Sequence, residues 1–125
     1  MAEVVELDGD NWDAEVLQSP LPILVDCWAT WCGPCALQAP EVEALADQEG
    51  DRLRVAKLDV DAFPFLVQDV ADVDLLPTCL LFVNGDLAHT IPGFHAKDEL
   101  LWEIEPFLKR RKEDLPPMTS LSSEY

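Results

Sequence analysis

Two cysteines separated by two residues, Cys32 and Cys35, carry the strongest chemical signal in the sequence. They follow an apolar run and precede a stretch with helical character, so we expect them at a corner between a strand and a helix. At the start of a helix, unpaired backbone N–H groups and the positive end of the helix dipole favour thiolate over thiol. Cys32 is therefore the candidate nucleophile.

Cys35 supplies the second half of a thiol–disulfide exchange. It lies one helical turn after Cys32, near enough to attack a mixed disulfide formed there and to release a reduced substrate. Gly33 and Pro34 tighten the corner between the two thiols. Pro34 also suits an early helical position, because its missing N–H would have no intrahelical partner there.

The apolar pattern predicts the elements that position this pair. Strands are expected at 4–7, 23–28, 53–60, 78–83 and 87–91, and Asn84-Gly85 predicts a hairpin between the last two. Helices are expected through Trp12 to Leu17 and at 34–48, 64–70 and 97–108. This order indicates an α/β domain with a central mixed β-sheet of about five strands flanked by about four helices.

Side-chain packing can also be predicted from this pattern. In the helix at 34–48, one apolar stripe is formed by four residues: Leu37, Val42, Leu45 and Ala46. Three large aromatic residues are expected in the core: Trp12, Trp102 and Phe107. His89 and His95 are expected at the surface or in loops.

Length and charge narrow the functional classes. The chain has 125 residues, of which 49% are hydrophobic, which suits a single domain with a core. Residues 1–108 hold 4 basic and 22 acidic residues, and the whole chain has a formal net charge of −17. Such a surface repels phosphate backbones, so we expect no nucleic-acid binding. A solvated surface, a salty cytoplasm and an acidic docking site all remain explanations of this charge.

The ends of the chain bear on location and domain boundaries. The first residues lack the features of a signal peptide, and the longest apolar stretch, 75–83, is too short to cross a bilayer, so we expect a cytoplasmic protein with no membrane partner. One domain is expected over 1–108. Residues 109–125 are expected to form a basic helix end and a disordered tail. The basic run 109–112 suits a helix C-terminus, and contact with a partner or an anionic lipid stays open.

Several segments in this order resemble the thioredoxin family over nearly the whole chain to Leu108. The matching segments are 25–35, Pro40, 56–61, 76–78, 82–85 and 93–94. The resemblance implies the thioredoxin fold, with Cys32 attacking a substrate disulfide and Cys35 resolving the intermediate. It also implies a protein-disulfide reductase that binds no cofactor and is recharged with electrons from NADPH by a separate thioredoxin reductase.

The resemblance assigns further residues to the same site. Trp31 would shield one side of the corner and Trp28 would pack beneath it, while Gly33 and Pro34 support the cysteines. Substrate would bind along five residues: Leu75, Leu76, Pro77, Thr78 and Gly93. Pro77 would be a cis-proline that faces the cysteine pair, and the Leu76 backbone would pair with a substrate strand.

Asp26 is an acid within an apolar strand, and its chemistry can be argued directly. Burial disfavours the charged carboxylate, so its pKa should rise. A group that titrates near neutrality can take the proton of Cys35 and return it in the reverse step. Lys57, on the neighbouring strand in the family, would moderate the shift. A structural buried acid is the alternative.

This sequence departs from the family pattern in two places. Leu75 stands where the family usually has a small residue, and Asp74 adds a negative charge beside it, so we expect altered partner preference. Cys27 and Cys79 replace larger apolar residues. They are interpreted as buried thiols, with a disulfide or regulatory pair as the alternative. No metal site is expected, because a four-cysteine zinc site would need core-facing thiols.

The expected partners are thioredoxin reductase and disulfide-containing substrate proteins, and we expect a monomer. The Gly33-Pro34 dipeptide favours a reductant, since oxidases and isomerases of this fold tend to carry histidine there. Two alternatives remain open. One is a disulfide oxidase or isomerase of the same fold, and the other is a redox-gated binding or regulatory module.

Overall fold

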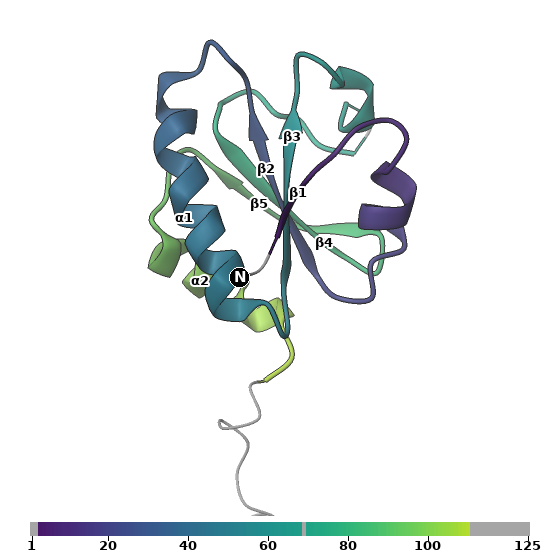
Figure 1. Ribbon diagram of the computed structural model, residues 1–125, viewed down its shortest axis with the longest axis vertical. Coiled ribbons are helices and arrows are strands. Elements are labelled where there is room, and N and C mark those ends of the chain that lie inside the picture. Colours follow the sequence, from purple (N-terminus) through teal and green to yellow (C-terminus); the bar gives the residue numbers. More distant parts are fainter. Residues whose placement is uncertain (1–2, 69, 111–125) are drawn as a thin grey trace, which may run out of the picture.

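Five strands form one mixed sheet in the order β1-β3-β2-β4-β5 in the computed structural model, which describes residues 3–68 and 70–110. The strands are β1 Val4–Glu6, β2 Ile23–Trp28, β3 Arg54–Asp59, β4 Thr78–Val83 and β5 Asp86–Pro92. β3 runs parallel to β1 and β2, and β4 runs antiparallel to β2 and β5. The central strand β2 therefore lies between a parallel and an antiparallel neighbour (Figure 1).

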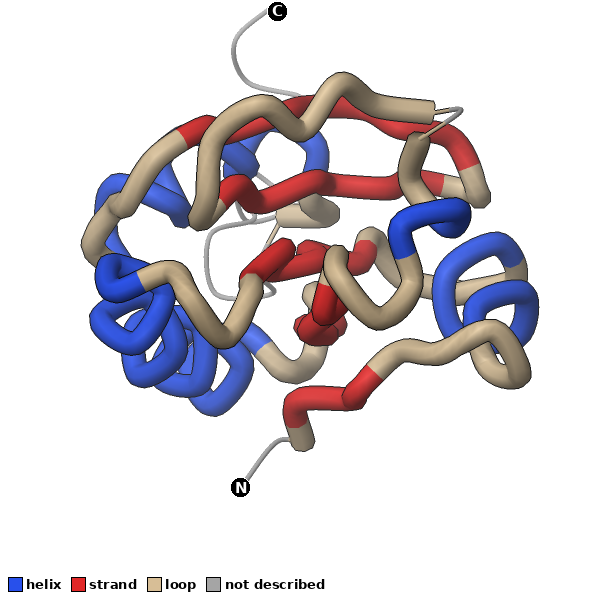
Figure 2. The backbone as a smooth tube through the Cα atoms, turned by 90° about the horizontal axis from the view of Figure 1, so that it is seen from above, coloured by secondary structure: helices blue, strands red, loops and turns tan. Residues whose placement is uncertain are grey.

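Helices cover both faces of this sheet (Figure 2). The helical segments are η1 Asp13–Leu17, α1 Gly33–Glu49, η2 Pro64–Leu66, α2 Lys97–Ile104 and η3 Glu105–Phe107. One core lies between the sheet and the helices α1 and α2, and a second core on the other face includes side chains of η1. The predicted α/β thioredoxin fold is confirmed. Within the described residues, no helix has both the length and the apolar character that a bilayer crossing requires.

The chain end differs from its prediction. The helix expected over 97–108 ends as α2 at Ile104 and continues only as the short η3, in which Pro106 cannot donate a backbone hydrogen bond. Trp102 was expected in the core, but it is 78% exposed, and Phe107 is also exposed. Residues 111–125 of the expected tail lie outside the described residues, and the boundary at residue 108 stays a prediction.

The prediction of which side chains of α1 are buried is wrong at one turn of the helix. Leu37 is exposed, whereas the neighbouring Gln38 is fully buried. The Gln38 side chain donates to the backbone carbonyl of His95 (2.9 Å) and accepts from its backbone N–H (3.0 Å). Because the amide pairs with both backbone groups, its burial leaves no hydrogen bond unmade. This contact ties α1 to the loop that precedes α2.

The β4–β5 hairpin forms at Asn84-Gly85, as predicted. Both residues have positive φ, 54° for Asn84 and 84° for Gly85. Two consecutive positive φ values are typical of the turn that Asn-Gly favours. A Cβ at Gly85 would lie only 2.8 Å from the backbone oxygen of Leu17. The hairpin therefore packs closely against the end of η1.

Candidate active site

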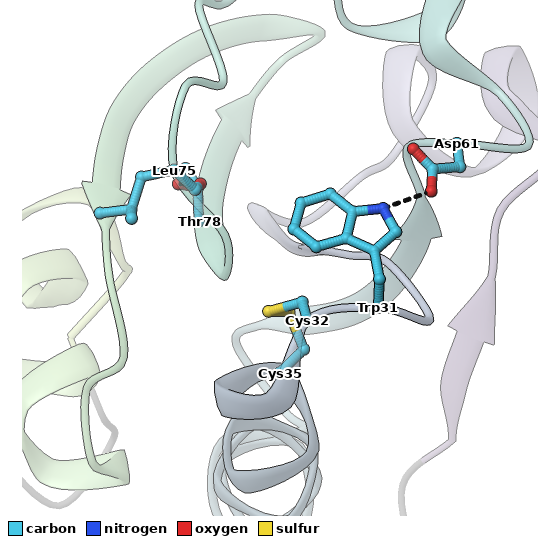
Figure 3. Close-up of a disulfide and its surroundings, with 6 residues drawn as sticks. All are labelled: Trp31, Cys32, Cys35, Asp61, Leu75 and Thr78. Carbon is cyan, nitrogen blue, oxygen red and sulfur yellow. Dashed lines mark hydrogen bonds between the residues drawn. A yellow bond between two sulfur atoms is a disulfide. The ribbon is translucent and has the colours of Figure 1, made fainter.

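A disulfide joins Cys32 and Cys35 at the start of α1. Cys32 is the residue that caps the helix, and Pro34 follows within its first turn. The two Cα atoms are 5.4 Å apart, and both cysteines are largely buried. Figure 3 shows the disulfide at the end of the helix, with Trp31 on one side and the segment of Leu75 and Thr78 on the other. We call the space between Trp31 and this segment the active-site opening.

Trp31 forms one wall of the opening. Its indole is 69% exposed, and its Nε1–H donates a hydrogen bond of 2.6 Å to Oδ2 of Asp61 (Figure 3). Trp28 is partly buried and packs against the cluster that contains both cysteines. The two tryptophans therefore have different surroundings, one facing solvent and one packed against the cysteine cluster.

The opposite wall is built around a cis peptide bond between Leu76 and Pro77. The Thr78 hydroxyl donates to the carbonyl oxygen of Leu75 (2.5 Å), and the backbone N–H of Gly93 donates to the Pro77 carbonyl (2.8 Å). Thr78 is buried, and Leu75 is 52% exposed. These bonds hold Gly93 beside the cis-proline and leave the Leu75 side chain at the surface of the opening.

Asp26 lies behind the disulfide, on the face of the sheet that α1 covers. It is 1% exposed, and within the described residues neither carboxyl oxygen has a hydrogen-bond partner. Burial raises its pKa from 3.8 to about 6, and the positive charge of Lys57 opposes that rise. Lys57 is the register partner of Asp26 on β3. A rise of this kind and a moderating Lys57 were both expected from the sequence, and the catalytic role of the pair stays a prediction.

A cavity of about 230 Å³ connects these groups. Its lining includes Asp26, Lys57, Cys32 and Cys35. A space of this size with several polar groups is large enough to hold water. Asp26 and Cys35 therefore border one water-sized space.

Comparison with known proteins identifies this arrangement. The sequence model of the thioredoxin family matches residues 3–106. The chain belongs to the thioredoxin family. It is 43% identical over 106 residues to a thioredoxin of Mycolicibacterium smegmatis, covering 83% of this chain and 94% of the relative. It is 42% identical over 97 residues to a thioredoxin of Acidithiobacillus ferridurans, covering 78% and 89%.

A third relative is a fusion protein. The bifunctional thioredoxin reductase/thioredoxin of Mycobacterium leprae (strain TN) is 41% identical over 100 residues, which cover 80% of this chain and 22% of the relative. Membership of the thioredoxin family together with the Cys32–Cys35 disulfide identifies the chain as an enzyme, a thiol–disulfide reductase.

The two remaining cysteines of this thioredoxin-family chain are free and buried. Cys79 is the register partner of Asp26, whereas Cys27 pairs with Thr78. Successive strand residues point to opposite faces, so Cys27 and Cys79 lie in the two different cores. The alternative of a disulfide between them is therefore wrong. Burial, reinforced by the charge of Asp26, raises the pKa of Cys27 to about 12 and that of Cys79 well above 9.0.

Two residues of the site had no role in the sequence interpretation. Asp61 orients Trp31, and Val60 packs against the cysteine cluster. Both follow directly after β3, and Val60 donates its backbone N–H to the Trp28 carbonyl (3.0 Å). The ends of parallel strands meet at one edge of a sheet, and this rule could have placed them beside the end of β2.

Proposed function

We propose that Cys32 is the nucleophile and Cys35 the resolving thiol of a protein-disulfide reductase. The Cys32 thiolate attacks one sulfur of a substrate disulfide, forms a mixed disulfide and releases the first substrate thiolate. Cys35 then attacks Cys32 and releases the second thiolate. The substrate gains two electrons, and the protein is left with the Cys32–Cys35 disulfide. The position of this pair at the start of α1, in an opening bordered by a cis-proline, carries the proposal.

Asp26 acts in this proposal as the proton acceptor and donor for Cys35. A carboxyl group with a pKa of about 6 exchanges protons readily near neutral pH. The cavity that both residues line supports the transfer. Lys57 sets the balance, because removing its charge would raise the pKa of Asp26 further.

Substrate binding is assigned to the wall opposite Trp31. The backbone of Leu76 pairs with an extended segment of the substrate, beside Pro77 and above the buried Thr78. Gly93 has a φ of +84° and no side chain, so a polypeptide can approach closely there. The Leu75 side chain contacts the substrate segment that binds along this wall.

A separate flavoprotein, a thioredoxin reductase that uses NADPH, returns electrons to the Cys32–Cys35 disulfide. The fused relative of Mycobacterium leprae, a bifunctional thioredoxin reductase/thioredoxin, supports this pairing. Such a cycle needs a reducing compartment, which supports a cytoplasmic location. The expectation of a monomer remains a prediction.

Trapping tests this function. Cys35→Ser should accumulate mixed disulfides with substrate proteins in cell extracts, because the resolving attack is lost, while Cys32→Ser should trap none. Mass spectrometry identifies the captured proteins through Cys32. Equal capture by both variants would contradict the assigned roles. The reduction potential, measured against glutathione, separates a reductant from an oxidase or isomerase.

A further inference from the structure

An open pocket of about 320 Å³ lies beside the active-site opening, between η2 and the segment 71–74. Most of its wall is apolar and comes from Val60, Pro64, Val67, Ala71 and Val73. A buried cavity of roughly 150 Å³ already accepts a benzene ring. The pocket therefore has room for a large aliphatic side chain.

Val60 lies between this pocket and the Cys32–Cys35 disulfide. It lines the pocket and also packs against the cluster of Ala29, Cys32 and Cys35. The pocket and the disulfide thus share a wall. A polypeptide whose cysteine reaches Cys32 brings neighbouring residues of its own within reach of the pocket.

The rim of the pocket is acidic. Asp72 and Asp74 both line it, and both are exposed. Asp61, which holds Trp31, adds a third carboxylate next to Val60. The sequence from 60 to 77 contains four aspartates and no lysine, arginine or histidine. Nothing basic within that segment offsets the negative field around the pocket.

We infer that this pocket is a specificity site for the substrate chain, which takes an aliphatic side chain into the pocket and a lysine or arginine onto the Asp72–Asp74 rim. The inference rests on the proposed function, because the substrate must dock at Cys32 for its flanking residues to reach the pocket. A basic substrate segment is favoured because its positive charge complements the carboxylates of the rim. A second copy of the chain, with its own net charge of −17, would instead be repelled.

Single-turnover reduction of synthetic peptides tests the inference without any reductase. Short Gly/Ser peptides with one central cysteine are prepared as symmetric disulfides. One leucine and one lysine are moved through successive positions around the cysteine. In matched peptides, alanine replaces the leucine or glutamate replaces the lysine. The rate constant for reduction by the dithiol form of the protein is measured by chromatography at low and high salt. Bis(2-hydroxyethyl) disulfide, which is small and uncharged, reports the chemistry alone.

At the best position, the lysine peptide should react about three- to tenfold faster than the glutamate peptide at low salt, and the difference should shrink at high salt. Asp72→Asn/Asp74→Asn should remove most of this preference. The matched control is Asp13→Asn/Asp51→Asn, which removes two exposed carboxylates on η1 and beyond the far end of α1. That control should retain the preference. Ala71→Leu, which fills the pocket, should abolish the preference for leucine over alanine.

Equal rates for the lysine and glutamate peptides would overturn the inference while leaving the reductase function intact. An equal loss of preference in the control variant would also overturn it, because overall charge rather than the rim would then be responsible. Failure of the unmodified protein to reduce even bis(2-hydroxyethyl) disulfide would instead count against the proposed function itself.

Discussion

Asp26 and Lys57 are register partners on the parallel strands β2 and β3, so both side chains lie on the face of the sheet that α1 covers. The Lys57 charge opposes the rise in the pKa of Asp26 but does not cancel it. The carboxyl group therefore prefers its protonated form more strongly in the folded protein than in the unfolded chain. This preference makes stability depend on pH.

Asp26→Asn should stabilise the protein above pH 6 and have little effect on its stability below pH 4. An acid whose pKa is raised by folding contributes most to stability at pH values below 3.8, its pKa in the unfolded chain. That contribution to stability is lost as the pH rises through about 6, its pKa in the folded protein. The full difference corresponds to roughly 3 kcal/mol at neutral pH, less the cost of burying the new amide. Urea unfolding of the oxidised proteins from pH 4 to 8 measures it. A stability difference that did not change with pH would contradict this account.

Leu75→Gly should change substrate preference. The Leu75 side chain is half exposed, and its Cδ2 atom lies 3.7 Å from the position that a Cβ on Gly93 would occupy. It therefore covers part of the surface on which substrate is proposed to bind. Losing this apolar contact should change the ratio of kcat/KM between two protein disulfides by about fivefold. Reduction of a small disulfide is the control and should change little. Unchanged ratios over several proteins would refute a role in selection.

Gly85→Ala should destabilise the fold by about 2–4 kcal/mol. The new Cβ would lie 2.8 Å from the backbone oxygen of Leu17, and an L-residue at a φ of +84° is strained in addition. Gly33→Ala is the matched control, because nothing lies within 4 Å of a Cβ there, and it should change stability by less than about 1 kcal/mol. Urea unfolding compares the two variants. Similar losses in both would show that the close approach to Leu17 is not the cause.

Arg52→Met should cost about 3–5 kcal/mol of stability, because it removes a buried cation that pairs with the buried carboxylate of Glu49. Arg52 is buried, and it donates to Glu49 (2.7 Å), to Glu105 (2.8 Å) and to the Lys109 carbonyl (2.9 Å). These bonds tie the end of α1 to η3.

The control for this change is Arg54→Met. Arg54 pairs with Glu15 at a partly exposed position, so its loss should cost no more than about 1 kcal/mol. Thermal or urea unfolding of both variants gives the comparison. An Arg52 variant no less stable than the Arg54 variant would mean that the buried pair contributes little.

Local signals predicted those parts of the fold that depend on neighbouring residues. The turn at Asn84-Gly85 needs two residues that tolerate positive φ. The start of α1 accepts Pro34, because its missing N–H would have no intrahelical partner there. The burial of Asp26 followed from its place in an apolar strand. The pairing of Cys32 with Cys35 followed from their spacing.

Features that depend on distant partners could not be predicted in this way. Gln38 is buried because its amide matches the backbone of His95, which lies 57 residues away. Helical periodicity instead favoured Leu37 for that position. Trp102 was expected in the core from its residue type alone, but the neighbouring Leu100 and Ile104 already fill the space under α2.

The separation of Cys27 and Cys79 by the plane of the sheet limits how many electrons the protein can carry. All four cysteines of the sequence lie in the described residues, and four thiols could in principle store two disulfides. Cys27 and Cys79 cannot join each other, and neither is open to solvent. The folded molecule thus stores two electrons in one internal dithiol, at the start of α1.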